Sequence, residues 1–375
     1  MKKMLFETML SGHRMEYIHH VYMGMIQNTE DDYVIVVQKE FEDKKSLYKW
    51  PKSENVRFVY ITEDIVRKDG VGLVRKSFFL TKVLRGYLQK EQVDSVFLIS
   101  LINYIIAMPF LISSKYKVSG IIYSIYLFNW VKSSWKRRLQ DMTKYLLMRF
   151  TPCLKTVFIL NDEESAHRLN KLYCSHKFKY ITDPFNELDY HPHNIRQELG
   201  VVYCDQLFLH FGGIAKRKGS LEILKAIALL SEKKRKESVF VFAGKVYDSI
   251  REEFYRLMGE LPSDSRILLY DEFCSNEFIA DLCVSSDFIL APYQETNRSS
   301  GLLGYAAYYG TPMIGPSDGL IGKLIHRYRL GETLPEGTAE CIAEKVSEVV
   351  PYRIDSDYNG VIKVEDFVKV LFLAF

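Results

Sequence analysis

Apolar runs alternate with amphipathic stretches along the chain, and this alternation predicts strands that are separated by helices. In the first half, the apolar runs predict strands at Lys3–Thr8, Tyr33–Gln38, Val56–Ile61, Val93–Ser100, Val118–Leu127 and Thr156–Asn161. The stretches between them repeat with a helical period and predict helices at His13–Gln27, Leu73–Lys90, Trp135–Phe150 and Glu163–Tyr173. Strand, helix and strand in this order favour an α/β fold, in which helices cover both faces of a parallel sheet.

A second series of the same kind follows the segment DPFNELDYHP (Asp183–Pro192), whose prolines and acidic residues are typical of a linker. The series predicts strands at Leu207–Gly213, Ser238–Gly244, Arg266–Phe273, Asp287–Pro292 and 313–315. The helices expected between them are Ser220–Glu232, Ser249–Gly259 and Asn276–Ser285. Two doubly wound domains in tandem usually bind a ligand in the cleft between them, beyond the carboxyl ends of the strands.

These two series divide the chain into domains. A length of 375 residues is too great for one ordinary hydrophobic core. We expect a first domain over residues 1–185 and a second over residues 186–350. The remaining segment, 351–375, ends in the apolar and helical stretch Val364–Phe375, which we expect to pack back on the first domain.

Charge and cysteine content exclude several classes of protein. A net charge of +3 is too small to indicate nucleic-acid binding, so we expect no nucleic-acid partner. The 6 cysteines include no CxxC pair, which argues against a zinc ribbon or a disulfide framework and favours a reducing cytosol.

Neither the N-terminus nor any internal stretch predicts a membrane-spanning helix. Glu7 interrupts the first apolar run, so we interpret that run as a strand rather than a signal peptide. The stretch Val96–Ser113 has the length of a membrane span, but Asn103 and Pro109 interrupt it. We therefore expect a buried strand followed by a core helix there.

The turn FGGIAKRKG (Phe211–Gly219) is the first candidate ligand site, because it follows a predicted strand and opens a helix. Gly212 and Gly213 would let the backbone approach a ligand, and the cations up to Arg217 and Lys218 could neutralise a diphosphate. The turn matches neither a P-loop nor GxGxxG. An ordinary solvated basic turn is the alternative.

The stretch Ala291–Ile325 is the second candidate site. A strand ends at Pro292, and a polar loop with Asn297, Arg298, Ser299, Ser300 and Gly301 leads into a short helix that Gly310 ends. The backbone N–H groups and the dipole at such a helix start can bind a phosphate. A plain helix cap by serine is the alternative. Both candidates follow strands of the same domain, at the end where ligands bind.

Residues 205–330 resemble the donor-binding domain of the family 4 glycosyltransferases. The resemblance is carried by FGGIAKRKG, VFAGK, YDEFCSNEFIADLCVSSDFILAPY and SSGLLGYAAYYGTPMIGPSDGLIGKLI, in this order and spacing. It implies the GT-B fold, in which two Rossmann-like domains face each other across a cleft. The first half resembles the family only in its layout.

The sequence departs from the family pattern at several positions, among them the basic residue expected a few residues before Lys218, where Gly213 or Ala215 stands and Arg217 could substitute. Many members carry two glutamates eight residues apart around the second loop, and Asn297 and Tyr305 occupy the matching positions here. The second glutamate usually holds the ribose of the nucleotide, so Tyr305 puts that contact in question. Tyr126 stands where members often carry a histidine, on the acceptor side.

The resemblance also implies a mechanism. In a retaining enzyme of this class, Arg217, Lys218 and the helix start at Ser300 and Gly301 would stabilise the charge that grows on the leaving diphosphate. A donor-binding role would extend to Gly212, Gly213, Asn297, Arg298, Ser299 and Tyr305. No cofactor is implied, because the nucleoside-diphosphate sugar is a substrate, and the sequence has no dedicated DxD metal site.

The loop between the first strand and the first helix is the candidate acceptor side. It contains Ser11, Gly12 and His13, and His13 is the best candidate for a contact with an acceptor hydroxyl. A helix cap with a solvated histidine explains the same residues.

Two basic amphipathic helices, at 73–90 and 130–150, could rest on the inner face of an anionic membrane, where a lipid-linked acceptor would be presented. A solvated surface is the alternative for both.

The sequence thus predicts a cytoplasmic glycosyltransferase that acts on a glycan or lipid-linked acceptor of a cell-surface or exported polysaccharide. Two alternatives stay open. One is a binding or partner subunit that keeps the fold without the chemistry, and the other is a sugar-nucleotide epimerase.

Overall fold

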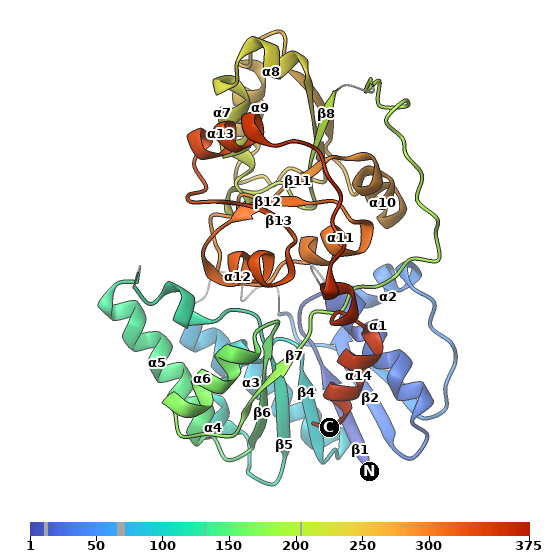
Figure 1. Cartoon of the computed structure of the whole chain (residues 1–375). Coiled ribbons are helices and arrows are strands. Elements are labelled where there is room, and N and C mark those ends of the chain that lie inside the picture. The colour runs from blue at the N-terminus through green and yellow to red at the C-terminus, as the bar shows by residue number, and fades with distance from the viewer. Residues whose placement is uncertain (11–13, 66–71, 132, 203–204) are drawn as a thin grey trace. The chain divides into compact units, whose positions relative to one another are not determined.

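The chain folds into two α/β units, and its C-terminal segment returns to the first unit (Figure 1). The computed structural model describes all residues except 11–13, 66–71, 132 and 203–204. Unit 1 consists of Met1–Asp183 together with Val364–Phe375, and unit 2 consists of Pro184–Lys363.

Unit 1 is built on a sheet of seven parallel strands in the order β3-β2-β1-β4-β5-β6-β7. The strands are β1 (Lys2–Phe6), β2 (Asp32–Gln38), β3 (Val56–Ile61), β4 (Ser95–Leu98), β5 (Lys117–Ile122), β6 (Leu154–Leu160) and β7 (Phe178–Ile181). Most of their residues are buried, as expected for a parallel sheet with helices on both faces.

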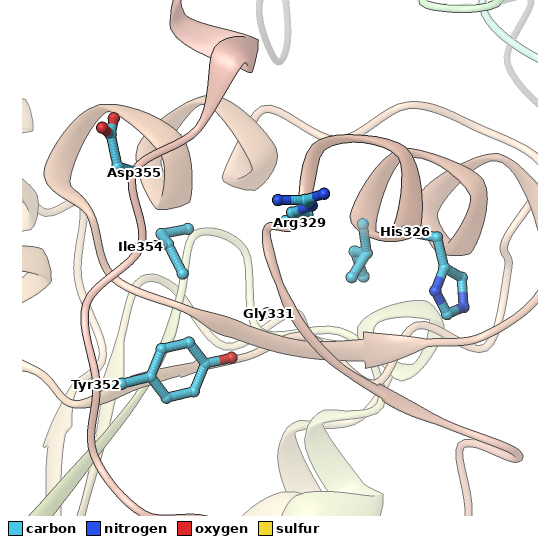
Figure 2. Close-up of a pocket in the computed structure, with 7 residues that line it drawn as sticks. His326, Arg329, Gly331, Tyr352, Ile354 and Asp355 are labelled. Carbon is cyan, nitrogen blue, oxygen red and sulfur yellow. The ribbon is translucent and has the colours of Figure 1, made fainter.

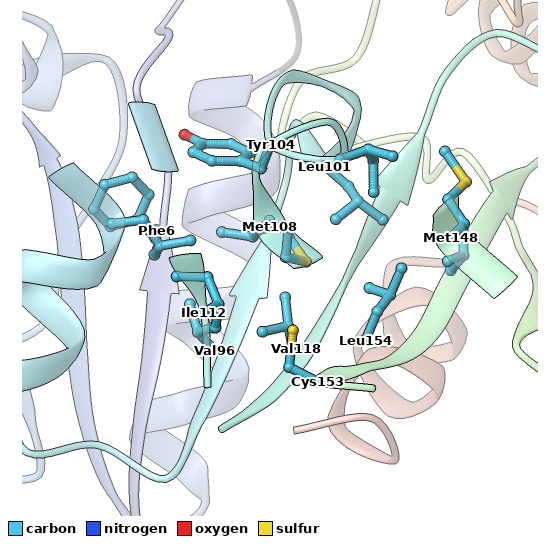
Figure 3. Close-up of a cluster of buried hydrophobic side chains, with 14 of the residues drawn as sticks. Phe6, Val96, Leu101, Tyr104, Met108, Ile112, Val118, Met148, Cys153 and Leu154 are labelled. Carbon is cyan, nitrogen blue, oxygen red and sulfur yellow. The ribbon is translucent and has the colours of Figure 1, made fainter. Parts of the chain in front are cut away.

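Two separate cores lie on the two faces of this sheet. One core packs against α3 (Leu73–Glu91), α4 (Met108–Leu111), α5 (Trp135–Phe150) and α6 (Glu163–Leu172). Figure 3 shows part of it, with Phe6, Val96 and Val118 of the sheet facing Tyr104 and Met108. The other core packs against α1 (Arg14–Gln27), α2 (Phe41–Lys44) and the C-terminal helix α14 (Val364–Phe372).

Unit 2 repeats this architecture with six parallel strands in the order β10-β9-β8-β11-β12-β13. The strands are β8 (Gln206–Phe211), β9 (Ser238–Ala243), β10 (Arg266–Tyr270), β11 (Phe288–Leu290), β12 (Met313–Pro316) and β13 (Gly331–Leu334). The helices are α7 (Ser220–Leu229), α8 (Glu232–Lys236), α9 (Arg251–Gly259), α10 (Asn276–Ser285), α11 (Leu302–Tyr309), α12 (Gly319–Tyr328) and α13 (Ala339–Glu348). Strand order changes direction at β8, so the loops after β8 and β11 meet at a topological switch point.

The structure confirms the predicted fold class of two parallel α/β sheets. The predicted helix Trp135–Phe150 agrees with α5 at both ends, and Gly310 ends α11 in the left-handed region with φ +66°. The apolar end of the chain forms the predicted helix α14. None of the described helices combines the length and the hydropathy that a membrane span requires.

Two predicted elements were wrong. The strand expected to reach Leu127 ends at Ile122, and Tyr126–Asn129 form a 3-10 turn instead. The core helix expected after β4 is replaced by a 3-10 turn at Leu101–Asn103 and by the short helix α4. Pro109 lies in the first turn of α4, and because proline lacks an N–H it begins a helix rather than continuing one. Apolar residues of both segments are buried, for example Met108 and Ile125, so periodicity alone could not separate the alternatives.

Helix α14 should contribute strongly to the stability of unit 1. Phe367 is fully buried, and its ring centroid lies 5.1 Å from that of Tyr17 in α1. We predict that Phe367→Ala lowers the free energy of unfolding of unit 1 by about 3–5 kcal/mol, because the truncation leaves a cavity. Urea unfolding followed by tryptophan fluorescence measures this, since Trp50, Trp130 and Trp135 all belong to unit 1.

The matched control is Leu373→Ala, because Leu373 is exposed near the same terminus. It should change the urea midpoint little. Equal shifts for the two variants would show that the packing of α14 does not stabilise unit 1.

Candidate donor-binding site

The basic turn after β8 places its three cations in two different environments. Lys216, Arg217 and Lys218 form a 3-10 turn, in which Lys216 and Arg217 are exposed. Lys218 is only 6 % exposed, and its Nζ donates a hydrogen bond of 3.0 Å to the carbonyl of Phe211. The three consecutive cations predicted to neutralise a diphosphate are therefore two exposed side chains and one buried amine.

Burial changes the chemistry of that amine. It lowers the pKa of Lys218 from 10.5 to about 7, and the charge of Arg217 acts in the same direction. A lysine amine in a low-dielectric site is easily shifted toward its neutral form. An incoming anion would favour the charged form again, so Lys218 is suited to respond to a phosphate group.

Glycine is required where the turn closes over this amine. Gly212 has φ +79°, and a Cβ built on it would lie 2.6 Å from Lys218 Nζ. Gly219 has φ +74°, and a Cβ there would lie 2.2 Å from the carbonyl oxygen of Pro292. Side chains at these positions would collide with the buried lysine or with the neighbouring loop. Gly213 is less confined, because a Cβ there would meet only the exposed ring of Tyr247, at 2.8 Å.

The loop after β11 lies directly against this turn. The backbone N–H of Gln294 donates to the carbonyl of Arg217 at 2.8 Å, and its Nε2 donates to the carbonyl of Gly337 at 2.8 Å. The Tyr293 hydroxyl lies 2.6 Å from Ser300 Oγ. Burial raises the pKa of Tyr293, whereas the hydrogen bond with Ser300 and the charge of Arg217 oppose this shift. The structure thus brings the two predicted loops together.

The start of α11 is partly engaged within its own loop. Ser300 Oγ accepts a hydrogen bond from the N–H of Leu302 at 3.3 Å, and the Ser300 carbonyl accepts from the N–H of Leu303 at 3.2 Å. These N–H groups stabilise the first turn of the helix. A phosphate at this loop would therefore use other backbone N–H groups near Ser300 and Gly301, and the predicted anion site stays a prediction.

The remaining donor-side candidates lie at the rim of the same loop. Arg298 is exposed, with Nη2 at 3.9 Å from the carboxylate of Glu295. Asn297 and Ser299 are half-buried. Tyr305 faces inward from α11, and its ring centroid lies 5.1 Å from that of Phe211 and 5.0 Å from that of Phe185. A residue that packs between two aromatic rings stands where a carboxylate was expected.

Sequence reasoning missed His210, which joins three elements behind the basic turn. Its Nδ1 lies 2.8 Å from the carbonyl of Leu290 in β11, and its Nε2 lies 2.8 Å from Ser220 Oγ in α7. Burial lowers the pKa of His210 to about 3, so the ring is neutral. Ser220 Oγ also accepts from the N–H of Ala215 at 3.1 Å. The available signal was a single polar residue inside the apolar strand QLFLHF.

The acceptor-side candidates lie in unit 1. Ser11, Gly12 and His13 are outside the described residues. Just before them, the buried Glu7 accepts hydrogen bonds from the N–H groups of Thr8 and Met9 at 2.7 and 2.8 Å. Burial raises the pKa of Glu7, and the nearby Arg14 charge opposes this shift. This buried carboxylate fixes the chain as it leaves β1, and sequence reasoning had assigned it no role.

Tyr126, the remaining acceptor-side candidate, packs among other tyrosines of unit 1. This residue is buried beside Tyr145, and its hydroxyl lies 2.7 Å from that of Tyr173. The ring became a core residue because β5 ends early and the chain turns inward at this position.

A surface pocket of unit 2 lies away from these loops (Figure 2). It has a volume of about 340 Å³ and lies at Gly331, the amino end of β13, whereas the candidate site follows the carboxyl ends of β8 and β11. Its lining consists of Ile325, His326, Arg329, Gly331, Tyr352, Ile354 and Asp355. Ligands of parallel α/β sheets bind at the carboxyl ends of strands, so we do not assign the donor to this pocket.

Several solved structures share this fold along nearly their whole length. Anabaena HepE, solved with UDP and glucose, is 13 % identical with a TM-score of 0.64, over 100 % of this chain and 95 % of that one. WaaG, a glycosyltransferase involved in lipopolysaccharide biosynthesis, is 14 % identical with a TM-score of 0.63, over 98 % and 94 %. UDP-GlcNAc 2-epimerase from Neisseria meningitidis is 13 % identical with a TM-score of 0.57, over 100 % and 99 %.

No protein-family model matches the sequence, and no curated protein matches it. At these identities the likeness concerns the fold alone. The chain therefore has the fold of the GT-B glycosyltransferases, and its activity has to be argued from its own residues.

The pKa of Lys218 predicts how stability depends on pH. The folded pKa lies below the unfolded value, so between about pH 7 and 10 the unfolded chain binds more protons. Stability should therefore rise with pH in this window, by up to about 1.4 kcal/mol per pH unit from this group. In Lys218→Met this contribution should be absent. Thermal unfolding of both proteins across the window, followed by circular dichroism, measures the difference.

All other titrating groups are shared by the two proteins, so the difference isolates Lys218. The same pH dependence in both would mean that the amine is not buried as described.

Proposed function

We propose that the protein is a glycosyltransferase that moves a sugar from a nucleoside-diphosphate sugar to a glycan or lipid-linked acceptor. The proposal rests on the amine of Lys218, which is buried under the turn that contains Gly212 and Gly219. The N–H of Gln294, in the loop that leads to Ser300, donates a hydrogen bond to the carbonyl of the adjacent Arg217. In a fold shared with proteins solved with UDP and with UDP-glucose, this cationic site suits a diphosphate.

The proposed chemistry is electrostatic stabilisation of the leaving group. As the bond between sugar and diphosphate breaks, negative charge grows on the diphosphate. Arg217, the Lys218 amine and backbone N–H groups at the start of α11 would stabilise this charge from positions fixed before the reaction. Retention of configuration and independence from a metal are part of the proposal and rest on the resemblance to the family 4 enzymes.

We place the activity in the cytoplasm, in the synthesis of a cell-surface or exported polysaccharide. Peripheral contact with the inner membrane face through residues 73–90 and 130–150 would bring the donor site to a lipid-linked acceptor. His13 is the proposed acceptor contact, on the strength of its place between β1 and α1.

An epimerase is the second candidate, favoured by the likeness to UDP-GlcNAc 2-epimerase along the whole chain. Such an enzyme would change the sugar of the donor without any acceptor. A partner subunit without chemistry is the third, favoured by Asn297 and Tyr305 at the positions of the expected glutamates.

Turnover of a panel of UDP-, GDP- and dTDP-sugars separates these candidates. We predict that one sugar nucleotide releases its nucleoside diphosphate faster than the buffer blank, with acceleration by a suitable acceptor. NMR of the same mixtures would detect an epimerised sugar with the nucleotide still attached. Neither binding nor turnover with any donor would contradict the transferase proposal, and binding without turnover would favour the partner subunit.

The Lys218 amine should contribute directly to donor affinity. We predict that Lys218→Ala weakens UDP binding by about 1.5–3 kcal/mol, roughly a tenfold to hundredfold increase in Kd, because one charge-assisted contact is lost. Isothermal titration calorimetry with UDP measures this. The matched control is Lys216→Ala, which removes an exposed cation from the same turn and should change Kd much less. Unchanged affinity in Lys218→Ala would show that the diphosphate binds elsewhere.

A further inference from the structure

His210 and Ser220 are two polar side chains in the apolar interior behind the basic turn. His210 is 1 % exposed, and Ser220 is fully buried. The ring of His210 packs at a steep angle against that of Phe242 in β9, with centroids 5.6 Å apart. Polar groups in such surroundings are costly unless each finds a partner. The two side chains therefore have to satisfy each other and the backbone around them.

The partners of His210 fix which ring nitrogen carries the proton. Nδ1 lies 2.8 Å from the carbonyl oxygen of Leu290, which can only accept, so Nδ1 is the donor. Burial lowers the pKa of His210 to about 3, so the ring is neutral and Nε2 carries no proton. The hydroxyl of Ser220, 2.8 Å away, then has to donate to Nε2.

The same hydroxyl also bonds the backbone of the basic turn. Ser220 has one hydroxyl proton, and this proton goes to His210. Toward Ala215 the Ser220 oxygen is therefore an acceptor, and the N–H of Ala215 donates to it at 3.1 Å. The Ala215 carbonyl lies farther away, at 3.2 Å, and could take the serine proton only if Nε2 were itself protonated. The hydrogen bonds thus run in one direction, from Ala215 through Ser220 and His210 to Leu290.

This chain of hydrogen bonds attaches the basic turn to the strand that leads into the second loop. Ala215 precedes the 3-10 turn that contains Lys218, and its carbonyl accepts from the N–H of Lys218 at 3.0 Å. Leu290 is the last residue of β11, and the chain continues from there to Gln294. The N–H of Gln294 donates to the carbonyl of Arg217 at 2.8 Å. The turn is therefore connected to the β11 segment at two points, one at Ala215 and one at Arg217.

We propose that His210 and Ser220 are positioning residues of the donor site. As a pair they hold the basic turn closed over the Lys218 amine, so that this amine meets a diphosphate in a fixed place. Neither side chain touches the substrate. Their role in donor binding rests on the proposed function, whereas their hold on Lys218 can be measured without any donor.

A pair that only stabilised the core would behave differently. Its loss would lower the free energy of unfolding and leave the surroundings of Lys218 unchanged. A pair that holds the turn closed also controls the access of water to the amine. If the turn loosens, the pKa of Lys218 moves from about 7 back toward the ordinary value of 10.5.

The first experiment measures that pKa by NMR of lysine labelled with carbon-13 at Cε, with Lys218→Ala to assign the signal. We predict that the pKa of Lys218 rises toward 10.5 in His210→Phe and in Ser220→Ala. In His210→Gln it should stay closer to the wild-type value, because the glutamine amide is long enough to reach Ser220 Oγ. Circular dichroism checks that each variant is folded, and Ser220→Ala and His210→Gln still decide the matter if His210→Phe is not.

The matched control is Ser285→Ala. Ser285 is fully buried like Ser220, and its Oγ accepts from the N–H of Ile195 at 2.8 Å. It lies at the end of α10, before the amino end of β11, whereas the basic turn follows the carboxyl end of β8. The control should lose stability, because a buried hydrogen bond is lost, and keep the wild-type pKa of Lys218.

Donor affinity gives the second measurement. We predict that His210→Phe raises the Kd of UDP at least about threefold, and that the same change in the Lys218→Ala background raises it much less. The reason is that His210 acts through the Lys218 amine. Isothermal titration calorimetry of the four proteins completes this double-mutant cycle.

Three results would overturn the proposal. The first is an unchanged pKa of Lys218 in the folded His210→Phe and Ser220→Ala variants. The second is full additivity of His210→Phe and Lys218→Ala in UDP affinity. The third is a nitrogen-15 NMR spectrum that places the ring proton of His210 on Nε2.

Failure of the proposed function would look different from failure of the positioning role. A wild-type chain that binds no UDP contradicts the proposed function, and a risen pKa of Lys218 in His210→Phe would still support the hold on the turn. UDP binding with an unchanged pKa of Lys218 in the variants contradicts the positioning role alone.

Discussion

An amine buried under a glycine turn is the constraint on which the candidate site depends. Burying the Lys218 amine is unfavourable unless it is hydrogen-bonded, and the Phe211 carbonyl supplies that bond. The turn above the amine has φ +79° at Gly212 and φ +74° at Gly219, and a Cβ at Gly219 would lie 2.2 Å from the carbonyl oxygen of Pro292. Several features of the loop sequence thus follow from one buried group.

The same constraint explains why His210 lies behind the turn. The neutral imidazole connects β11 to α7 and fixes Ser220, which bonds the backbone of Ala215. A charged histidine beside Lys218 would repel the amine, and burial prevents this by lowering the pKa of His210. The neutral ring of His210 therefore supports the turn through Ser220 without adding a charge beside Lys218.

The fold could be predicted from the sequence because periodicity and strand order are local patterns. The helices at Trp135–Phe150 and Asn276–Ser285 agree with the structure at both ends. Prediction failed where a buried apolar run changes direction, as after Ile122, since burial alone does not distinguish a strand from a turn that packs on the sheet. The short edge strand β7 had too few residues to show a pattern.

Part of the candidate site could be predicted for a similar reason. Both loops follow strands, and parallel strands of one sheet bring their carboxyl ends to the same edge, so Arg217 and Ser300 were expected near each other. The burial of Lys218 and the roles of His210 and Gln294 depend on contacts between loops far apart in the sequence. Residue spacing within one loop carries no information about such contacts. For the same reason the burial of Tyr126 could not be predicted from its position in the sequence.

Tyr305 makes the surroundings of the candidate site aromatic. Its ring packs between Phe211, at the end of β8, and Phe185, and a Cβ on Gly304 would lie 2.7 Å from the Phe185 ring. A glutamate at position 305 would have to place its carboxylate among these rings, where desolvation opposes ionisation. The two loops of the candidate site therefore present cations and aromatic rings at their junction.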